Sequence, residues 1–196
     1  MINGHVGGRY LDDEFFWSVF DRAESLDVPL YIHPTPPSEL VVDTLYTGNF
    51  STDVTDVLST AGWGWHIDTA THVLRLVLSG VFDRYPDLEI VIGHLGEGLA
   101  SMLARIESVF DRDLTGLDEP VGRYFRRNLH YTISGFNTVP TFENLVSLVG
   151  ADRITFSADY PFASMEDARE FLGRLPISPA DRRKIAHKNA ERLLGL

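Results

Sequence analysis

The chain has 196 residues, 44% of them hydrophobic and 23% charged, which is the composition of a globular domain with one sizeable core. Its net charge of −11 disfavours nucleic acid and anionic membrane surfaces as partners, and it has no apolar run long enough to predict a membrane span. The lack of cysteine excludes disulfides and thiolate–metal sites, and the N-terminus does not have the pattern of a signal peptide.

Short apolar segments alternate with longer segments of helical periodicity. Strands rich in β-branched and aromatic residues are expected at 28–33, 88–94, 128–134 and 153–158. Helices with apolar residues at helical spacing are expected at 14–26, 68–82, 99–110, 140–149, 165–175 and 179–194. This alternation predicts an α/β domain with a parallel sheet, either doubly wound or closed into a barrel. The sequence has neither a dinucleotide-binding fingerprint nor a phosphate-binding loop, so the usual signs of a doubly wound nucleotide binder are missing.

One connection is unusually long. Residues 34–65 separate an expected strand from the next helix, and loops of this length often form lids or binding loops. We therefore expect a single domain over residues 1–196 with a long loop insertion at 34–65. Trp63 and Trp65 in this loop either fill the core or form the wall of an aromatic ligand site, and the core is the simpler interpretation for each alone.

Three of the expected strands end in a side chain that can bind a metal ion, namely His33, His94 and Asp159. Ligands of parallel α/β structures bind beyond the carboxyl ends of the strands, so these side chains are expected to meet at one mouth. Imidazole and carboxylate groups suit Zn²⁺, Mn²⁺ or Fe²⁺. Alternatively, the histidines are structural hydrogen-bonding residues and Asp159 caps the following helix.

The motifs around these residues resemble the metal-dependent amidohydrolase-2 family. They read IHPTPP (32–37), IGHLGEG (92–98), FSADYPF (156–162) and, at the C-terminus, KIAHKNAERLLGL. The chain is most similar to nonoxidative decarboxylases of 5-carboxyvanillate, γ-resorcylate and 2,3-dihydroxybenzoate. The resemblance implies a (β/α)₈ TIM barrel. The chain has room for about the last five βα units, and it lacks the Glu-x-His or His-x-His pair that the family carries on strand 1. An incomplete barrel covering roughly strands 4–8 is therefore expected.

The resemblance also implies roles for individual residues. His33 and Asp159 correspond to metal ligands, and Asp159 also to a proton carrier. His94 corresponds to the histidine beside the substrate, and Glu97 to its acidic partner. Arg105 matches an arginine that reaches a substrate in a neighbouring subunit, although its place off the apolar stripe of its helix equally indicates a solvated side chain. The catalytic set expected from the resemblance is therefore His94, Asp159, Glu97 and Arg105.

The same resemblance suggests the substrate contacts and the cofactor. Asn3, Trp63, Trp65 and Phe162 are expected to contact the substrate. Lysines occur only in the last helix, so no strand offers a carbamylated lysine to bridge two metal ions. One divalent ion, Zn²⁺ or Mn²⁺, is the expected cofactor. Of the remaining histidines, His5 lies with Asn3 where strand 4 should end and is a further site candidate. His66, His72, His130 and His187 are interpreted as structural or solvated unless the geometry shows otherwise.

The expected function is metal-dependent, nonoxidative decarboxylation of a hydroxylated aromatic acid. Whether the shortened chain is itself active is left open. Two alternatives stay open: hydrolysis of a lactone or amide on the same scaffold, and a non-catalytic barrel fragment that acts by association. The expected partners are a small aromatic carboxylic acid and further copies of the chain in a dimer or tetramer. A cytoplasmic location is expected.

Overall fold

The computed structural model describes residues 1–196 and contains a five-stranded parallel sheet in the order β1-β4-β5-β6-β7. The strands are β1 (Ile2–Asn3), β4 (Leu30–His33), β5 (Ile90–Ile92), β6 (Leu129–Thr132) and β7 (Ile154–Thr155). A small antiparallel hairpin joins β2 (His5–Val6) and β3 (Arg9–Tyr10). The sheet is open, because β1 and β7 lie at its two ends and do not pair with each other. Each of the four strands expected from the sequence is present, and all four are shorter than predicted.

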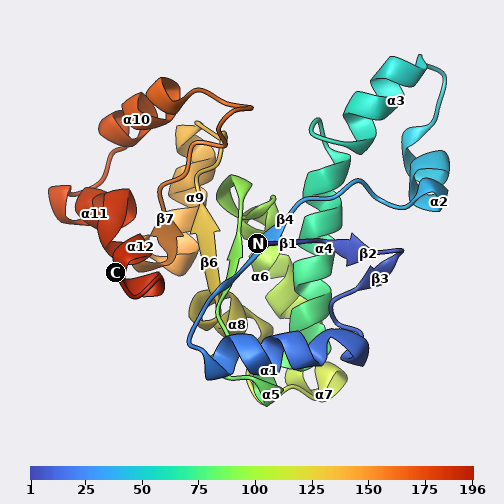
Figure 1. The fold of residues 1–196 in the computed structure, drawn as a ribbon, viewed down its shortest axis with the longest axis horizontal. Helices are drawn as coiled ribbons and strands as arrows, with labels where there is room; N and C mark the ends of the chain where they lie inside the picture. Colours follow the sequence, from blue (N-terminus) through green and yellow to red (C-terminus); the bar gives the residue numbers. More distant parts are fainter.

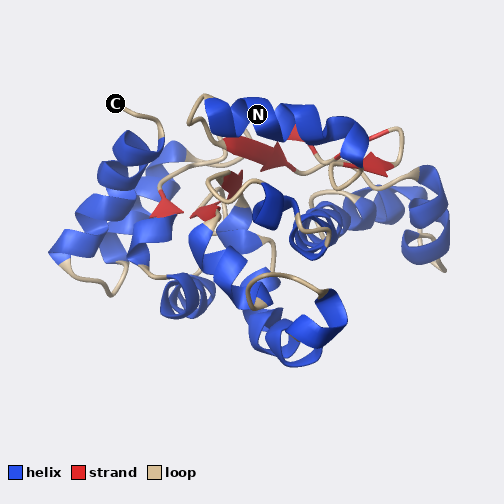
Figure 2. Cartoon of the chain, turned by 90° about the horizontal axis from the view of Figure 1, so that it is seen from below, coloured by secondary structure: helices blue, strands red, loops and turns tan.

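Helices surround the sheet, as Figures 1 and 2 show. The longer ones are α1 (Trp17–Ser25), α3 (Thr52–Ser59), α4 (Gly64–Leu78), α6 (Leu99–Val109), α8 (Val121–Arg127), α9 (Val139–Val149) and α10 (Met165–Arg174). The shorter ones are α2 (Glu39–Val41), α5 (Val81–Arg84), α7 (Arg112–Thr115), α11 (Pro179–Arg183) and α12 (Asn189–Leu193). Single turns occur at η1 (Glu14–Phe16), η2 (Val42–Tyr46), η3 (His94–Gly96), η4 (Ala151–Arg153) and η5 (Lys184–Lys188). None of these helices is both long and apolar enough to cross a lipid bilayer.

The segment 34–65 differs from the expected loop, because it contains α2, η2 and α3. Helix α3 is preceded by its N-cap, Ser51, whose hydroxyl accepts a hydrogen bond from the backbone N–H of Val54 and so satisfies one of the free N–H groups of the first turn. Figure 1 shows α2 and α3 at one end of α4, away from the sheet. Helix α4, which was predicted at 68–82, begins earlier, at Gly64, and ends earlier, at Leu78.

The register of the sheet separates an apolar face from a polar one. Ile32 pairs with Ile92, Ile92 with Tyr131, and Tyr131 with Ile154, so these side chains form one row across the sheet. Since side chains alternate along a strand, His33, one position beyond Ile32, lies on the opposite face. The sheet thus uses one face for the core and leaves the other to polar groups.

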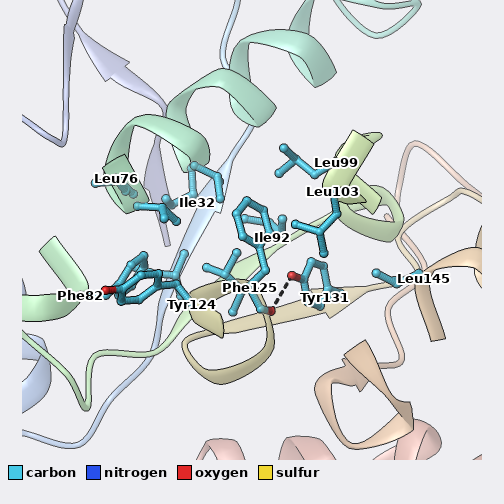
Figure 3. Close-up of a cluster of buried hydrophobic side chains, with 14 of the residues drawn as sticks. Ile32, Leu76, Phe82, Ile92, Leu99, Leu103, Tyr124, Phe125, Tyr131 and Leu145 are labelled. Carbon is cyan, nitrogen blue, oxygen red and sulfur yellow. Dashed lines mark hydrogen bonds between the residues drawn. The ribbon is translucent and has the colours of Figure 1, made fainter. Parts of the chain in front are cut away.

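The core lies between the apolar face of the sheet and the helices behind it (Figure 3). Ile32, Ile92 and Tyr131 from the strands meet Leu76 of α4 and Leu103 of α6, and none of these five side chains is more than marginally exposed. The Tyr131 hydroxyl donates a 2.8 Å hydrogen bond to the carbonyl of Phe125, so its one polar atom is satisfied inside the core. This packing fixes the strands whose carboxyl ends carry the candidate site residues.

Candidate active site

A cavity of about 390 Å³ opens at the carboxyl ends of the parallel strands. His33 ends β4, and the loops that leave β5, β6 and β7 bring His94, Ser134 and Asp159 to the same cavity. The structure therefore brings together the three strand-end residues that the sequence predicted to meet. This is the place where parallel α/β sheets bind their ligands.

Three consecutive strand ends leave the sheet through an unusual backbone conformation. His94, Ser134 and Asp159 have positive φ values of 49°, 34° and 66°, in the left-handed region that non-glycine residues rarely adopt. Each costs roughly 1–3 kcal/mol, and such strained residues cluster at active sites and ligand-binding positions. The same geometry at three neighbouring strand ends supports a functional role for this rim and adds Ser134 to it.

His33 has the hydrogen-bond pattern of a ligand that keeps one nitrogen free. Its Nδ1–H donates to the carbonyl oxygen of Pro34 over 2.7 Å, so Nε2 carries the lone pair. The side chain is half-buried and lines the cavity. Histidines that bind metals commonly donate the other ring N–H to a carbonyl or carboxylate in this way.

A buried carboxylate, Glu97, connects two histidines. Its side chain is 0% exposed, and its two oxygens accept hydrogen bonds from His94 Nδ1 at 2.7 Å and from His66 Nδ1 at 2.5 Å. Burial raises the pKa of Glu97, but the hydrogen bonds from His66 and His94 outweigh it and hold that pKa below its ordinary value. Glu97 therefore remains a carboxylate and fixes the orientation of both imidazole rings.

Asp159 faces His94 across the cavity. Asp159 Oδ2 lies 3.9 Å from His94 Nε2, beyond hydrogen-bond distance, and the aspartate side chain is 31% exposed. An interposed ligand oxygen or a small movement would connect the two groups. Asp159 is thus available for a ligand while His94 stays fixed to Glu97.

The residues present fit a divalent ion in part. His33 Nε2 and the Asp159 carboxylate are free donors on one cavity, and both suit Zn²⁺ or Mn²⁺. Catalytic zinc sites usually have three protein ligands, so this pair is short of one. His66, His94 and Glu97 also offer ligand atoms within 4.8 Å of one another, but the Glu97 oxygens and both Nδ1 atoms are already engaged in hydrogen bonds.

Two of the residues expected to contact substrate line the cavity. Trp65 and Phe162 do so, and Phe162 is 88% exposed at the rim. Trp63 lies instead in an adjoining groove between α4 and α6 and is 53% exposed. Asn3 is exposed at the end of β1, where it pairs in register with His33, and Arg105 is exposed on α6; neither lines the cavity. The roles of all five residues stay predictions.

His66 and Phe136 also line the cavity, although neither was predicted from the sequence to do so. His66 follows Trp65 at the start of α4, and its ring centroid lies 4.8 Å from that of His94. Phe136 contacts both rings, with centroids 5.0 Å from His66 and 5.3 Å from His94. His66 and Glu97 are 31 residues apart in the chain, so no local motif links them.

The other histidines lie outside the cavity. His72 is fully buried and accepts a hydrogen bond from the Leu11 N–H, and His130 is fully buried on β6 beside Glu89. His187 is exposed in η5. This agrees with the structural or solvated roles expected for these three.

The amino-acid sequence is similar to those of proteins named as decarboxylases. The decarboxylase orsB of Emericella nidulans is 34% identical over 99% of this chain and 60% of its own length. A gamma-resorcylate decarboxylase of Polaromonas sp. is 37% identical over 95% of this chain and 56% of its own length. The chain therefore spans a little more than half the length of these relatives.

The fold is similar to solved structures that are also named as decarboxylases. The 5-carboxyvanillate decarboxylase of Sphingomonas paucimobilis matches all of this chain with a TM-score of 0.90 and 32% identity, over 57% of its own length. A dihydroxybenzoic acid decarboxylase of Polaromonas sp., with bound manganese and the inhibitor 2-nitroresorcinol, matches 94% of this chain and 55% of its own. Its TM-score is 0.85 and its identity 34%. The prediction of an incomplete TIM barrel, similar to aromatic acid decarboxylases, is confirmed.

The family model described as Amidohydrolase matches residues 1–196. It thus covers every strand end that lines the cavity, together with the sheet and helices that hold them. The chain belongs to the amidohydrolase family.

Proposed function

We propose that this chain forms the carboxyl-terminal half of the active site of a metal-dependent nonoxidative decarboxylase that acts on a hydroxylated aromatic acid. The observation that carries the proposal is the convergence of His33, His94 and Asp159 on one cavity with aromatic walls. The relatives and structural neighbours named as decarboxylases of such acids support it.

The reaction consumes one proton for each carboxylate lost, because an aryl carboxylate and a proton give the arene and CO₂. Protonating the ring carbon first avoids an aryl carbanion, and a hydroxyl ortho or para to the carboxylate supplies the electrons. His94 Nδ1–H is held by Glu97, so its Nε2 faces the cavity and can take the phenolic proton. Asp159, opposite His94, is the group we assign to carry the consumed proton: its carboxylate takes a proton from solvent and passes it to the ring carbon.

The walls of the cavity suit a flat ring. Trp65, Phe136 and Phe162 line it, and aromatic side chains bind a planar substrate through offset or edge-on contacts. Asn3 does not line this cavity, but it lies next to His33 in the sheet register, so we assign it to a polar group of the substrate that extends past His33.

His33 and Asp159 would hold the divalent ion, which when bound would orient the carboxylate and phenolic oxygens and favour the phenolate. The bound manganese of the neighbouring structure favours Mn²⁺ as the first ion to test, with Zn²⁺ as the second. These two side chains are one short of the three protein ligands that are usual at a catalytic metal site, so the ion would need a further ligand.

We also propose a homo-oligomer. Arg105 on α6 is exposed and does not line the cavity of its own chain. Trp63 and Met102 expose apolar surface in the groove between α4 and α6. In a dimer or tetramer, Arg105 would reach a substrate held by a second copy and Trp63 would be covered.

The decisive experiment measures CO₂ release with Mn²⁺ from 2,6-dihydroxybenzoate and from 5-carboxyvanillate, in parallel with hydrolysis of an aryl lactone. It uses the chain alone and the chain joined to the amino-terminal half of a relative. We expect CO₂ release in the joined protein, its loss in His94→Asn and Asp159→Asn, and no loss in His187→Asn, which changes an exposed histidine outside the cavity.

The alternatives give different results. Lactone hydrolysis without CO₂ release would replace the decarboxylase assignment by the hydrolase one. A joined protein that binds Mn²⁺ but converts neither class of substrate would support the non-catalytic fragment, for which the open sheet is the structural argument.

A further inference from the structure

His66 has an acceptor on each of its two ring nitrogens. Nδ1 lies 2.5 Å from Glu97 Oε2, and Nε2 lies 3.2 Å from the carbonyl oxygen of Ala61. A carbonyl oxygen accepts only, and Glu97 is ionised, so both ring nitrogens must donate. A neutral imidazole has one N–H, and only the doubly protonated ring satisfies both contacts.

The surroundings of His66 are compatible with a positive charge. Its side chain is 12% exposed, and the ionisable groups that face it are Glu97, His94 and, across the cavity, Asp159. Phe136 covers another side of the ring. Burial lowers the pKa of His66, but the hydrogen bond and the charge of Glu97 outweigh it, so the pKa lies above the ordinary value.

We propose that His66 is a positioning residue that acts as an imidazolium cation, joining the buried Glu97 carboxylate to the turn at Ala61 that closes one side of the cavity. Ala61 and Trp65 both line the cavity, and His66 holds the turn between them. Because both nitrogens are engaged, His66 offers no proton acceptor to a ligand. His94 is then the one imidazole on Glu97 whose Nε2 stays available for chemistry.

The role of His66 in catalysis rests on the proposed function. Its protonation state and the order of the turn at residues 61–65 do not, because both are measured without substrate. A failed decarboxylation assay therefore leaves the test below intact, and a neutral His66 leaves the decarboxylase proposal intact.

The first measurement is a long-range ¹H–¹⁵N correlation spectrum of the full chain labelled with ¹⁵N-histidine. At pH 6.5, the ordinary pKa of an imidazole, we expect both His66 nitrogens to be protonated in most molecules, because the pKa of His66 is raised above that value. His66 is assigned by its loss in His66→Asn and, independently of any variant, by contacts from its ring to Phe136. A neutral tautomer at this pH overturns the proposal.

The second measurement is amide exchange in residues 61–65. The asparagine of His66→Asn keeps an N–H near Glu97 but is too short to reach Ala61. We therefore expect the protection of the Gly62, Trp63 and Trp65 amides to fall about tenfold, which corresponds to the loss of one charge-assisted hydrogen bond. His66→Gln, which reaches toward Ala61, should retain more protection than His66→Asn.

The control variant is His187→Asn, which removes an exposed histidine that also pairs with a glutamate and should leave these amides unchanged. Unchanged protection in His66→Asn contradicts the positioning role. If that variant does not fold, the wild-type chain decides. Protection of residues 61–65, corrected for intrinsic exchange, should fall as pH rises through the His66 titration, while that of α9 should not.

Discussion

Glu97 provides the sharpest test of the site because its charge is buried and its partners are known. The substitution Glu97→Gln keeps the shape of the side chain and removes the charge. A glutamine has one acceptor oxygen, so its NH₂ group must face an N–H of His66 or His94. One hydrogen bond is lost and the other loses its charge, so the loss is bounded by two charge-assisted bonds at about 1.5–3 kcal/mol each, or about 3–6 kcal/mol, and we expect roughly 3 kcal/mol, the lower end of the range for breaking a buried ion pair.

The pH dependence of this loss follows from the two pKa shifts. The pKa of Glu97 is lowered from 4.5, so its contribution is complete above that value and is lost as pH falls through the lowered pKa. The pKa of His66 is raised from 6.5, so its contribution is complete below that value and is lost as pH rises through the raised pKa. The destabilisation by Glu97→Gln should therefore be largest between pH 4.5 and 6.5.

Urea unfolding at pH 3, 5.5 and 9 measures this effect. The matched control is Glu191→Gln, an exposed glutamate that accepts from His187 and Lys188, and it should change the unfolding free energy little. A loss below about 1 kcal/mol at pH 5.5, or one that is equal at all three pH values, would refute the reasoning, since one charge-assisted bond alone exceeds that amount.

Three further outcomes are expected. Burial lowers the pKa of His72 to about 4, so the unfolded chain binds a proton that the folded chain does not, and the unfolding free energy should fall by about 3 kcal/mol from pH 6.5 to 4; urea titrations should show this slope in wild type and not in His72→Gln. Asp159→Asn should weaken Mn²⁺ binding at least tenfold by calorimetry, because it removes the one carboxylate among the two assigned donors; unchanged affinity would argue against that assignment. Gly96→Ala should lower the unfolding free energy by about 1–2 kcal/mol in urea titrations, because Gly96 has φ of +86° and a new Cβ would lie 3.0 Å from the Tyr131 ring.

Much of the fold was predictable because its signals are local. β-Branched runs marked the strands around Ile32, Ile92 and Tyr131, and these residues form the row that carries the core. The helix α3 was missed although Ser51 gives a local capping signal, because the polar and turn-forming residues around it suggested a loop.

The candidate site was predictable in its strand-end residues and not in its contacts. His33, His94 and Asp159 were found because the carboxyl end of each parallel strand faces the same side of the sheet. His66 was not found, since its role depends on how α4 packs against the turn that carries Glu97. The roles of Arg105 and Trp63 could not be predicted from the sequence pattern, because the pattern of a helix or loop predicts that a side chain is exposed but not which molecule contacts it.

The open sheet makes this protein suited to fragment complementation. Strands β1 and β7 end the sheet without pairing with each other, so both edges can pair with strands of a separately produced polypeptide. Under the proposed function, turnover by the assembled protein would report the association of the two polypeptides. Fusing each piece to one member of an interacting pair would turn arene formation into a readout of that encounter.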